Sequence, residues 1–253
     1  MAKFFLFIFV IIVAGFFAVS NRAVKPTLIP TPTPITQNNS TPIEIKFNEQ
    51  VYHISMEKIE EPNNVRLIPN FSEQKTSSDV AKEYSCQALV SGQFYTTDNQ
   101  PLGYLQIRYN IINSNIHNPG FFNGFVISQN GRLDITPELP QSELIGFAFQ
   151  AGPLFTSETK LTIRSDEPAR RILLGKTDTG DFYFLAITQK DNSFSGPLLA
   201  ELPGLIKSFN QSQFLSLKFK VLINLDGGTA SVFINDLVTL SELAPVGSFL
   251  CET

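Results

Sequence analysis

Asn224 and Asp226 are the strongest candidates for chemistry in the sequence, because two polar side chains stand together at the end of an apolar segment. Residues 218–231 read KFKVLINLDGGTAS. Alternation predicts a strand with Asn224 and Asp226 on one face and the apolar residues on the other, namely Phe219, Val221, Ile223 and Leu225. The pair Gly227 and Gly228 would let the backbone turn tightly and approach a ligand. An Asp-Gly pair between apolar runs is also the usual signal for a β-hairpin turn, and the local sequence leaves both interpretations open.

Arg170 and Arg171 supply a second candidate, within the apolar segment 169–175, ARRILLG. A guanidinium group can bind two oxygens of a phosphate at once. Neighbouring residues of a strand face opposite ways, so only one of the two arginines can serve a given site. The alternative is an ordinary solvated arginine at the surface.

Gln150 and Gly152 form a third candidate in the segment QAGPL, residues 150–154, although Gly-Pro after a strand is usually only a turn. Signatures of other chemistries are missing. The two histidines, His53 and His117, do not form a metal-binding motif, and the sequence has no G-x-S-x-G motif or P-loop. The sequence therefore predicts no metal site, and it does not indicate a cofactor.

The composition indicates one substantial folded domain and excludes one class of partner. Of the 253 residues, 43% are hydrophobic, which is enough for a single large core. The 19 basic residues are outnumbered by 23 acidic ones, giving a net charge of −4. Nucleic acid is not expected as a partner, because binding to its backbone needs clustered Lys and Arg.

The N-terminus predicts export and a membrane tether. Lys3 precedes an unbroken apolar run from Phe4 to Val19, and residues 1–23 are interpreted as a signal or anchor segment. Residues 24–42 are rich in Pro and Thr, which favours an extended linker. We therefore expect a protein anchored in the cell membrane and facing the extracytoplasmic side, or a secreted protein if the segment is cleaved.

The only two cysteines, Cys86 and Cys251, are either bridged or two free thiols. Export makes a disulfide possible. A bridge across so long a loop would stabilise the fold by roughly 4–5 kcal/mol in the chain-entropy model.

Residues 43–253 are expected to form a single α+β domain, with a largely antiparallel mixed sheet and a few packed helices. Two segments favour helices, 77–84 and 197–209, and Pro203-Gly204 is expected to interrupt the second. Strands are expected in many short apolar runs, with these boundaries: 43–54, 87–95, 104–111, 124–128, 144–150, 169–175, 182–188, 219–225 and 230–234.

The order of the motifs resembles the phosphodiester glycosidase family. That family carries a Q-x-G-P-x-L segment, an R-T-x-x-G strand, a helix with an L-x-E-L pattern and an N-L-D-G-G-x-S-S turn. This sequence has QAGPL at 150–154, RILLG at 171–175, LLAEL at 198–202 and NLDGG at 224–228, preceded by GQFY at 92–95.

The resemblance implies hydrolysis of a sugar-1-phosphodiester in surface glycans. Arg171 would bind the phosphate, and Asp226 would act as acid/base or nucleophile at the anomeric carbon. The resemblance also implies a set of substrate-binding residues, Asn224, Gln150, Gly152, Gly227 and Gly228. The sequence names no second carboxylate.

Five positions depart from the family pattern: Ser91, Gln93, Phe155, Ile172 and Ala230. Gln93 stands where the family has a glycine, and its side chain is expected to narrow or reshape the pocket. Three of the departures, Ser91, Gln93 and Ile172, keep a second hypothesis open, a catalytically inactive module that binds envelope glycans.

Overall fold

The computed structural model describes residues 42–139, 144–212 and 216–253. The expected signal or anchor segment, 1–23, lies outside the described residues, as does the linker up to residue 41. None of the described helices is long and apolar enough to cross a membrane.

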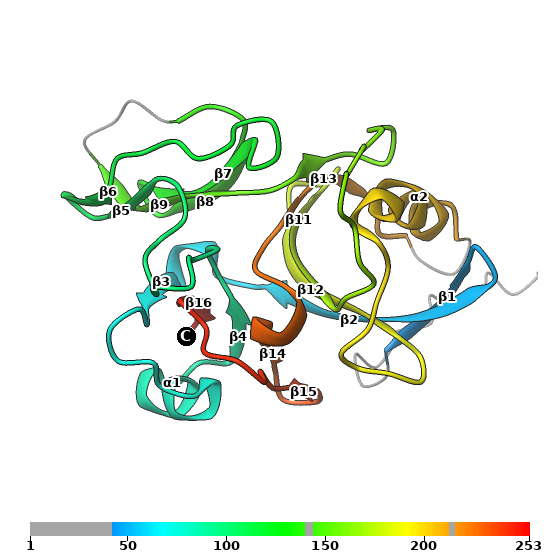
Figure 1. The fold of residues 1–253 in the computed structure, drawn as a ribbon, viewed down its shortest axis with the longest axis horizontal. Helices are drawn as coiled ribbons and strands as arrows, with labels where there is room; N and C mark the ends of the chain where they lie inside the picture. Colours follow the sequence, from blue (N-terminus) through cyan, green and yellow to red (C-terminus); the bar gives the residue numbers. More distant parts are fainter. Residues whose placement is uncertain (1–41, 140–143, 213–215) are drawn as a thin grey trace, which may run out of the picture. The chain divides into compact units, whose positions relative to one another are not determined.

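The described residues form three antiparallel sheets (Figure 1). The first sheet has the order β1 (Ile43–Phe47), β2 (Gln50–Ile59), β12 (Phe182–Gln189), β11 (Arg171–Thr177), β13 (Phe219–Asn224) and β10 (Leu154–Phe155). The second has the order β15 (Thr239–Leu240), β14 (Phe233–Ile234), β4 (Ala88–Ser91), β16 (Ser248–Glu252) and β3 (Val65–Pro69). The third has the order β6 (Asn110–Asn113), β5 (Leu105–Ile107), β9 (Ile145–Ala151), β7 (Gly124–Gln129) and β8 (Arg132–Thr136).

Helices contribute little to the described fold. The α-helices are α1 (Ser77–Tyr84) and α2 (Leu202–Gln211), and the 3-10 turns are η1 (Pro62–Asn64), η2 (Leu199–Glu201) and η3 (Gly228–Ala230). The expected α+β class is therefore confirmed only in part, because the fold is mostly β. The expected mixed sheet is replaced by ladders that are antiparallel wherever the structure describes a pairing.

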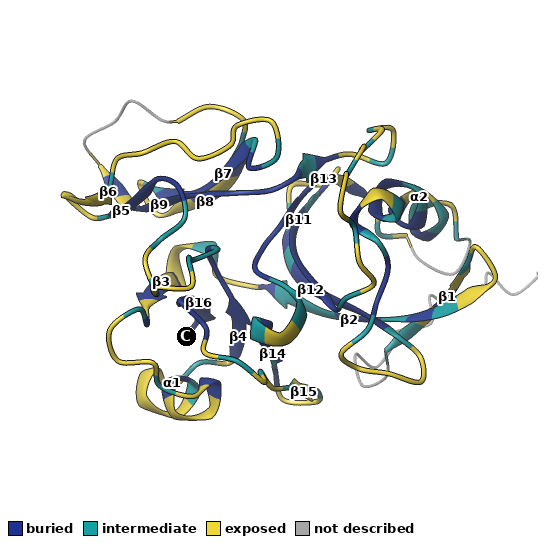
Figure 2. Cartoon of the chain, viewed as in Figure 1, coloured by how far each residue is buried: buried dark blue, intermediate teal, exposed yellow. Residues whose placement is uncertain are grey.

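The main core joins all three sheets. One cluster of buried apolar side chains includes Ile172 of the first sheet, Leu250 of the second and Val126 of the third, each fully shielded from solvent. Figure 2 shows β4, β11 and β12 buried along most of their length. Each such side chain stabilises the fold by about 1.5–3 kcal/mol relative to an exposed one, so the sheets are held against one another by apolar contact.

Helix α2 covers the other face of the first sheet. Its buried residues Leu205, Ile206 and Phe209 share a cluster with Leu173 and Leu222. The expected helical segment 197–209 is divided next to Pro203, because the 3-10 turn η2 ends at Glu201 and α2 begins at Leu202. Pro203 lies in the first turn of α2, where backbone N–H groups have no partner within the helix.

Helix α1 has the expected bounds, and Thr76 caps it by accepting a hydrogen bond from the Asp79 N–H at 3.2 Å. The chain then reaches Cys86, which forms a disulfide with Cys251 of β16. The alternative of two free thiols is therefore wrong for this structure.

The hairpin interpretation of Asp226-Gly227 is also wrong. Strand β13 belongs to the first sheet, whereas β14 belongs to the second and pairs with β4 and β15. Residues 225–232 therefore carry the chain from one sheet to another. Gly152-Pro153, a cis peptide bond, similarly connects β9 of the third sheet to β10 of the first. The expected turns are crossings between sheets.

Strand β13 is not amphipathic as the alternation suggests, because the sheet is covered on both faces. Val221, Ile223 and Leu225 face the main core as expected. Phe219 faces the α2 side, since the pairing register shifts between Lys176 and Thr177. A one-residue irregularity changes which face a side chain occupies.

Candidate active site

Four of the sequence motifs meet where the chain passes between sheets. Leu173 pairs with Asn224, and continuing this antiparallel register places Arg171 opposite Asp226 on the same face. The Asp226 N–H donates to the Gly92 carbonyl at 3.0 Å, and the Asn224 N–H donates to the Pro153 carbonyl at 3.0 Å. Residues far apart in the sequence are thus fixed together by backbone hydrogen bonds.

A cavity of about 270 Å³ lies at this junction. It contains five of the seven residues expected at the site, Arg171, Asn224, Asp226, Gly227 and Gly228. The rest of its lining is Phe94, Phe121, Ser165, Asp166, Glu167, Ala169 and Leu199. Gln150 and Gly152 do not line it.

Arg171 is buried, with only one end of its guanidinium group committed. Nε donates to the Pro197 carbonyl at 2.9 Å, and Nη2 donates to the Glu167 carbonyl and to Asp166 Oδ1 at 3.4 Å. No described residue accepts a hydrogen bond from Nη1. Burial lowers the pKa of Arg171, and the Asp166 charge opposes this shift. The hydrogen bonds of Nε and Nη2 hold the guanidinium group in place, and the Nη1 N–H donors stay unused at the cavity.

The Asp226 carboxyl, unlike the Arg171 guanidinium group, has no charged partner in the described part of the chain. The residue is 8% exposed, and its Oδ2 is buried without a hydrogen-bond partner among the described residues. Burial raises the pKa of Asp226 to about 8, although the Gly227 N–H opposes the shift. Arg171 pairs with Asp166 and not with Asp226. At neutral pH the Asp226 carboxyl is therefore mainly protonated and able to donate a proton.

Asn224 is fixed by its amide nitrogen and leaves its oxygen unused. Nδ2 donates to the Gly152 carbonyl at 3.1 Å, whereas Oδ1 is buried with no partner among the described residues. A buried acceptor without a donor costs roughly 1–3 kcal/mol. Such a group at a cavity is suited to accept a hydrogen bond from a ligand hydroxyl or from water.

Arg170 and Arg171 face opposite ways, as alternation predicts, but neither is a solvated surface residue. Arg170 is fully buried, and its guanidinium group donates to Ser231 Oγ at 2.6 Å and to the Ser241 carbonyl at 2.7 Å. Burial lowers its pKa to about 10. Its backbone carbonyl accepts from the Gly228 N–H at 2.9 Å. Arg170 thus holds the turn that follows Asp226.

Both positions of this turn favour glycine. A Cβ at Gly227 would lie 2.9 Å from the Arg170 carbonyl oxygen. Gly228 has a φ of +66°, in the left-handed region that L side chains disfavour. The double glycine lets the turn pack on β11 and places its backbone in the cavity wall.

Sequence reasoning missed Asp166, Phe94 and Phe121. The Asp166 carboxylate accepts hydrogen bonds from the Leu199 and Ala200 N–H groups at 2.9 and 2.8 Å, so it caps η2 and holds Arg171. Asp166 lies in an irregular segment with no alternation or motif, and its only signal is an acidic pair just before Pro168. The phenylalanines are brought to the cavity by loops whose course the sequence pattern does not specify.

The departures from the family pattern do not line the cavity. Ser91, Gln93 and Ile172 are all fully buried. The Gln93 side chain was expected to narrow the pocket, but its amide nitrogen donates to the Tyr104 carbonyl at 2.9 Å instead. Ser91 Oγ donates to the Asp226 carbonyl oxygen at 2.6 Å and so supports the site from behind.

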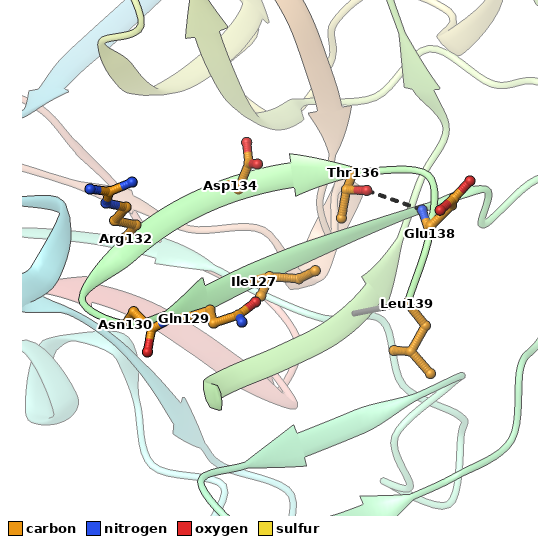
Figure 3. A pocket seen from close by; sticks show the side chains of 8 residues that line it. All are labelled: Ile127, Gln129, Asn130, Arg132, Asp134, Thr136, Glu138 and Leu139. Carbon is orange, nitrogen blue, oxygen red and sulfur yellow. Dashed lines mark hydrogen bonds between the residues drawn. The ribbon is translucent and has the colours of Figure 1, made fainter. Parts of the chain in front are cut away.

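A larger hollow of about 860 Å³ lies on the β7–β8 hairpin (Figure 3). Its polar lining includes Arg132, Glu138 and Asp134, and Asp134 forms an ion pair with Lys176 at 2.8 Å. It contains none of the motif residues. Within the described part of the chain, no group of three or more His, Cys, Asp or Glu residues is placed to hold a metal ion.

The fold is similar to those of several solved structures, two of which are given below. One is the catalytic domain of zebrafish N-acetylglucosamine-1-phosphodiester α-N-acetylglucosaminidase, auto-inhibited by its pro-peptide, with a TM-score of 0.60, 14% identity, and coverage of 83% of this chain and 81% of that chain. The other is a hypothetical protein from Synechocystis, with a TM-score of 0.55, 12% identity, and coverage of 83% and 61%. No curated protein sequence matches the chain.

The phosphodiester glycosidase family model matches residues 84–250. This range contains both crossings and every residue expected at the site. The chain belongs to the phosphodiester glycosidase family, and the resemblance of its motifs to that family is confirmed.

Proposed function

We propose that this protein hydrolyses sugar-1-phosphodiester linkages in surface glycans at the cavity between Arg171 and Asp226. One observation carries the proposal: Asp226, whose buried Oδ2 has no partner among the described residues, lines the same cavity as Arg171 with its unused donors. Burial raises the pKa of Asp226 to about 8, which favours the neutral carboxyl. A neutral carboxyl does not repel an anionic phosphodiester, whereas an ionised one would.

The residues have separate roles in this reaction. Arg171 Nη1 binds a phosphate oxygen, and Asp226 gives its proton to the oxygen between phosphorus and the anomeric carbon as that carbon–oxygen bond breaks. A water molecule adds its hydroxyl group to the anomeric carbon, and its remaining proton restores Asp226. Asn224 Oδ1 accepts a hydrogen bond from a sugar hydroxyl or from this water. The products are a free sugar and a phosphomonoester.

The place of action is part of the proposal. The apolar run from Phe4 to Val19 and the Pro/Thr-rich segment after it support an extracytoplasmic enzyme tethered to the membrane. The disulfide between Cys86 and Cys251 is compatible with an oxidising compartment.

The alternative of an inactive glycan-binding module is less well supported. It was based on Ser91, Gln93 and Ile172, and these side chains are buried outside the cavity lining. Arg171, Asn224 and Asp226 all remain at the cavity. The departures therefore leave the proposed reacting groups in place.

Product analysis tests the proposal. The purified protein is incubated with an N-acetylglucosamine-1-phosphodiester and with other sugar-1-phosphodiesters, and the free sugar and phosphomonoester are measured by mass spectrometry. We expect the two products in equal amounts. Binding of these compounds without any release of sugar would favour the inactive module.

A further inference from the structure

The segment from His117 to Asn123 is held on the end of β9 by Gln150. The Gln150 amide nitrogen donates to the His117 and Phe122 carbonyls at 2.9 and 2.6 Å, and its oxygen accepts from the His117 N–H at 2.8 Å. Gln150 is 1% exposed. Its oxygen also accepts from the Tyr104 N–H at 3.4 Å, so three of the four hydrogen bonds of this amide go to the segment from His117 to Asn123.

Gly152 and Leu154 hold the same segment. A Cβ at Gly152 would lie 2.4 Å from the Phe121 carbonyl oxygen, so only glycine lets the two backbones approach this closely. The Leu154 N–H donates to Asn123 Oδ1 at 2.6 Å. The QAGPL segment therefore contacts residues 117–123 at three points, through Gln150, Gly152 and Leu154.

These contacts help to place aromatic residues in the lining of the cavity. Phe121 and Phe94 both line the cavity, and each packs edge-on against the buried Phe122, with ring centroids 4.8 and 5.0 Å apart. Arg171, Asn224 and Asp226 provide the polar part of the same lining. Aromatic residues beside a few polar groups match a sugar, which has a C–H face and hydroxyl groups at its rim.

We infer that Phe121, with Phe94, is the platform for the C–H face of the substrate's sugar ring, and that Gln150 and Gly152 are positioning residues that hold this platform. The inference rests on the proposed function and adds a sugar-binding subsite to it. Gln150 and Gly152 were expected to bind substrate directly, but their contacts with residues 117–123 give them an indirect role through Phe121.

The platform is tested by separating sugar binding from phosphate binding. Phe121→Ala should raise the KM for a sugar-1-phosphodiester roughly tenfold with kcat changed less than about twofold, because uniform binding is lost. The dissociation constant of N-acetylglucosamine 1-phosphate, measured by NMR titration, should rise by a similar factor, and that of inorganic phosphate should not change. Phe121→Tyr keeps the ring and should restore both values.

The positioning role of Gln150 is tested with Gln150→Met and a matched control, Gln106→Met. Gln106 is also buried, but its amide bonds Tyr104 and Arg108, which lie outside the cavity lining. Gln150→Met should speed hydrogen exchange of the amides in residues 117–123 and raise KM as Phe121→Ala does. The control should do neither.

The outcomes separate this inference from the proposed function. Wild-type turnover with an unchanged KM in Phe121→Ala would overturn the platform and leave the function standing. If the wild type binds N-acetylglucosamine 1-phosphate but does not turn over any sugar-1-phosphodiester, the function is overturned, and the dissociation constant of this probe for Phe121→Ala still decides the platform. If the wild type neither binds nor turns over these compounds, both are overturned.

Discussion

Two carboxyl groups, those of Asp166 and Asp226, line one cavity in opposite surroundings. Asp166 accepts hydrogen bonds from two backbone N–H groups and from Arg171. Asp226 Oδ2 has no partner among the described residues, and burial raises the pKa of that carboxyl to about 8. A difference of this kind assigns different tasks to two acids of the same type. Here Asp166 holds Arg171, and Asp226 is free to transfer a proton.

The raised pKa of Asp226 predicts how stability depends on pH. An unfolded Asp titrates near pH 3.9, whereas the folded group keeps its proton up to about pH 8. Its contribution to the free energy of unfolding is thus fully present below about pH 4 and falls until about pH 8. Asp226→Asn lacks this loss and should be more stable than wild type by at least about 1 kcal/mol at pH 7.5. Urea unfolding at several pH values measures the difference, and a pH-independent difference would contradict the assignment.

The site is formed where the chain crosses from one sheet to another, and the local sequence pattern predicts the structure of these crossings poorly. Helix α1 and strands β7 and β12 agree closely with the expected ranges, because each has a clear apolar period. The crossings at Gly152-Pro153 and Asp226-Gly227 have the residues of ordinary turns, and pattern alone does not reveal which sheet receives the next strand. Residue types and spacing made Asp226 and Arg171 candidates, and the family resemblance gave them their expected roles. Asp166 and Phe121 depend on tertiary contacts, and the only local signal of either is the acidic pair before Pro168.

The η2 turn and Arg171 are coupled through Asp166, so the loss of this carboxylate should affect both. Asp166→Ala removes two N-terminal acceptors of η2 and the charged partner of a buried arginine. We expect a loss of about 3 kcal/mol in the free energy of unfolding and a higher KM. Asp166→Asn keeps one acceptor and should lose less. Urea titration and steady-state kinetics measure the two effects, and a loss below about 0.5 kcal/mol in Asp166→Ala would show that the contacts are dispensable.

On the scale of the whole molecule, the site depends on the packing of the three sheets around one core. The second sheet supports the site through β16, because the Ser248 carbonyl accepts from the Gly92 N–H at 2.8 Å and the Gly92 carbonyl in turn accepts from Asp226. The Cys86–Cys251 disulfide fixes β16 to the end of α1.

The disulfide joins residues 165 positions apart, so it restricts the unfolded chain strongly. Its removal in a Cys86→Ala, Cys251→Ala double variant should lower the free energy of unfolding by roughly 2–5 kcal/mol. The comparison is made by urea unfolding of the wild type and the variant, with reduced wild type as a control. Equal unfolding midpoints for all three would show that the bridge does not stabilise the domain.

Turnover by Asp226→Asn is the most direct test of the central claim that Asp226 is the proton donor of a phosphodiester glycosidase site. Asn keeps the size of the side chain but has no acidic proton, so the fold should remain intact by circular dichroism. We predict a fall in kcat on a sugar-1-phosphodiester of roughly 10²–10⁴, the usual contribution of acid–base catalysis. A correctly folded Asp226→Asn variant that is as active as the wild type would contradict the account.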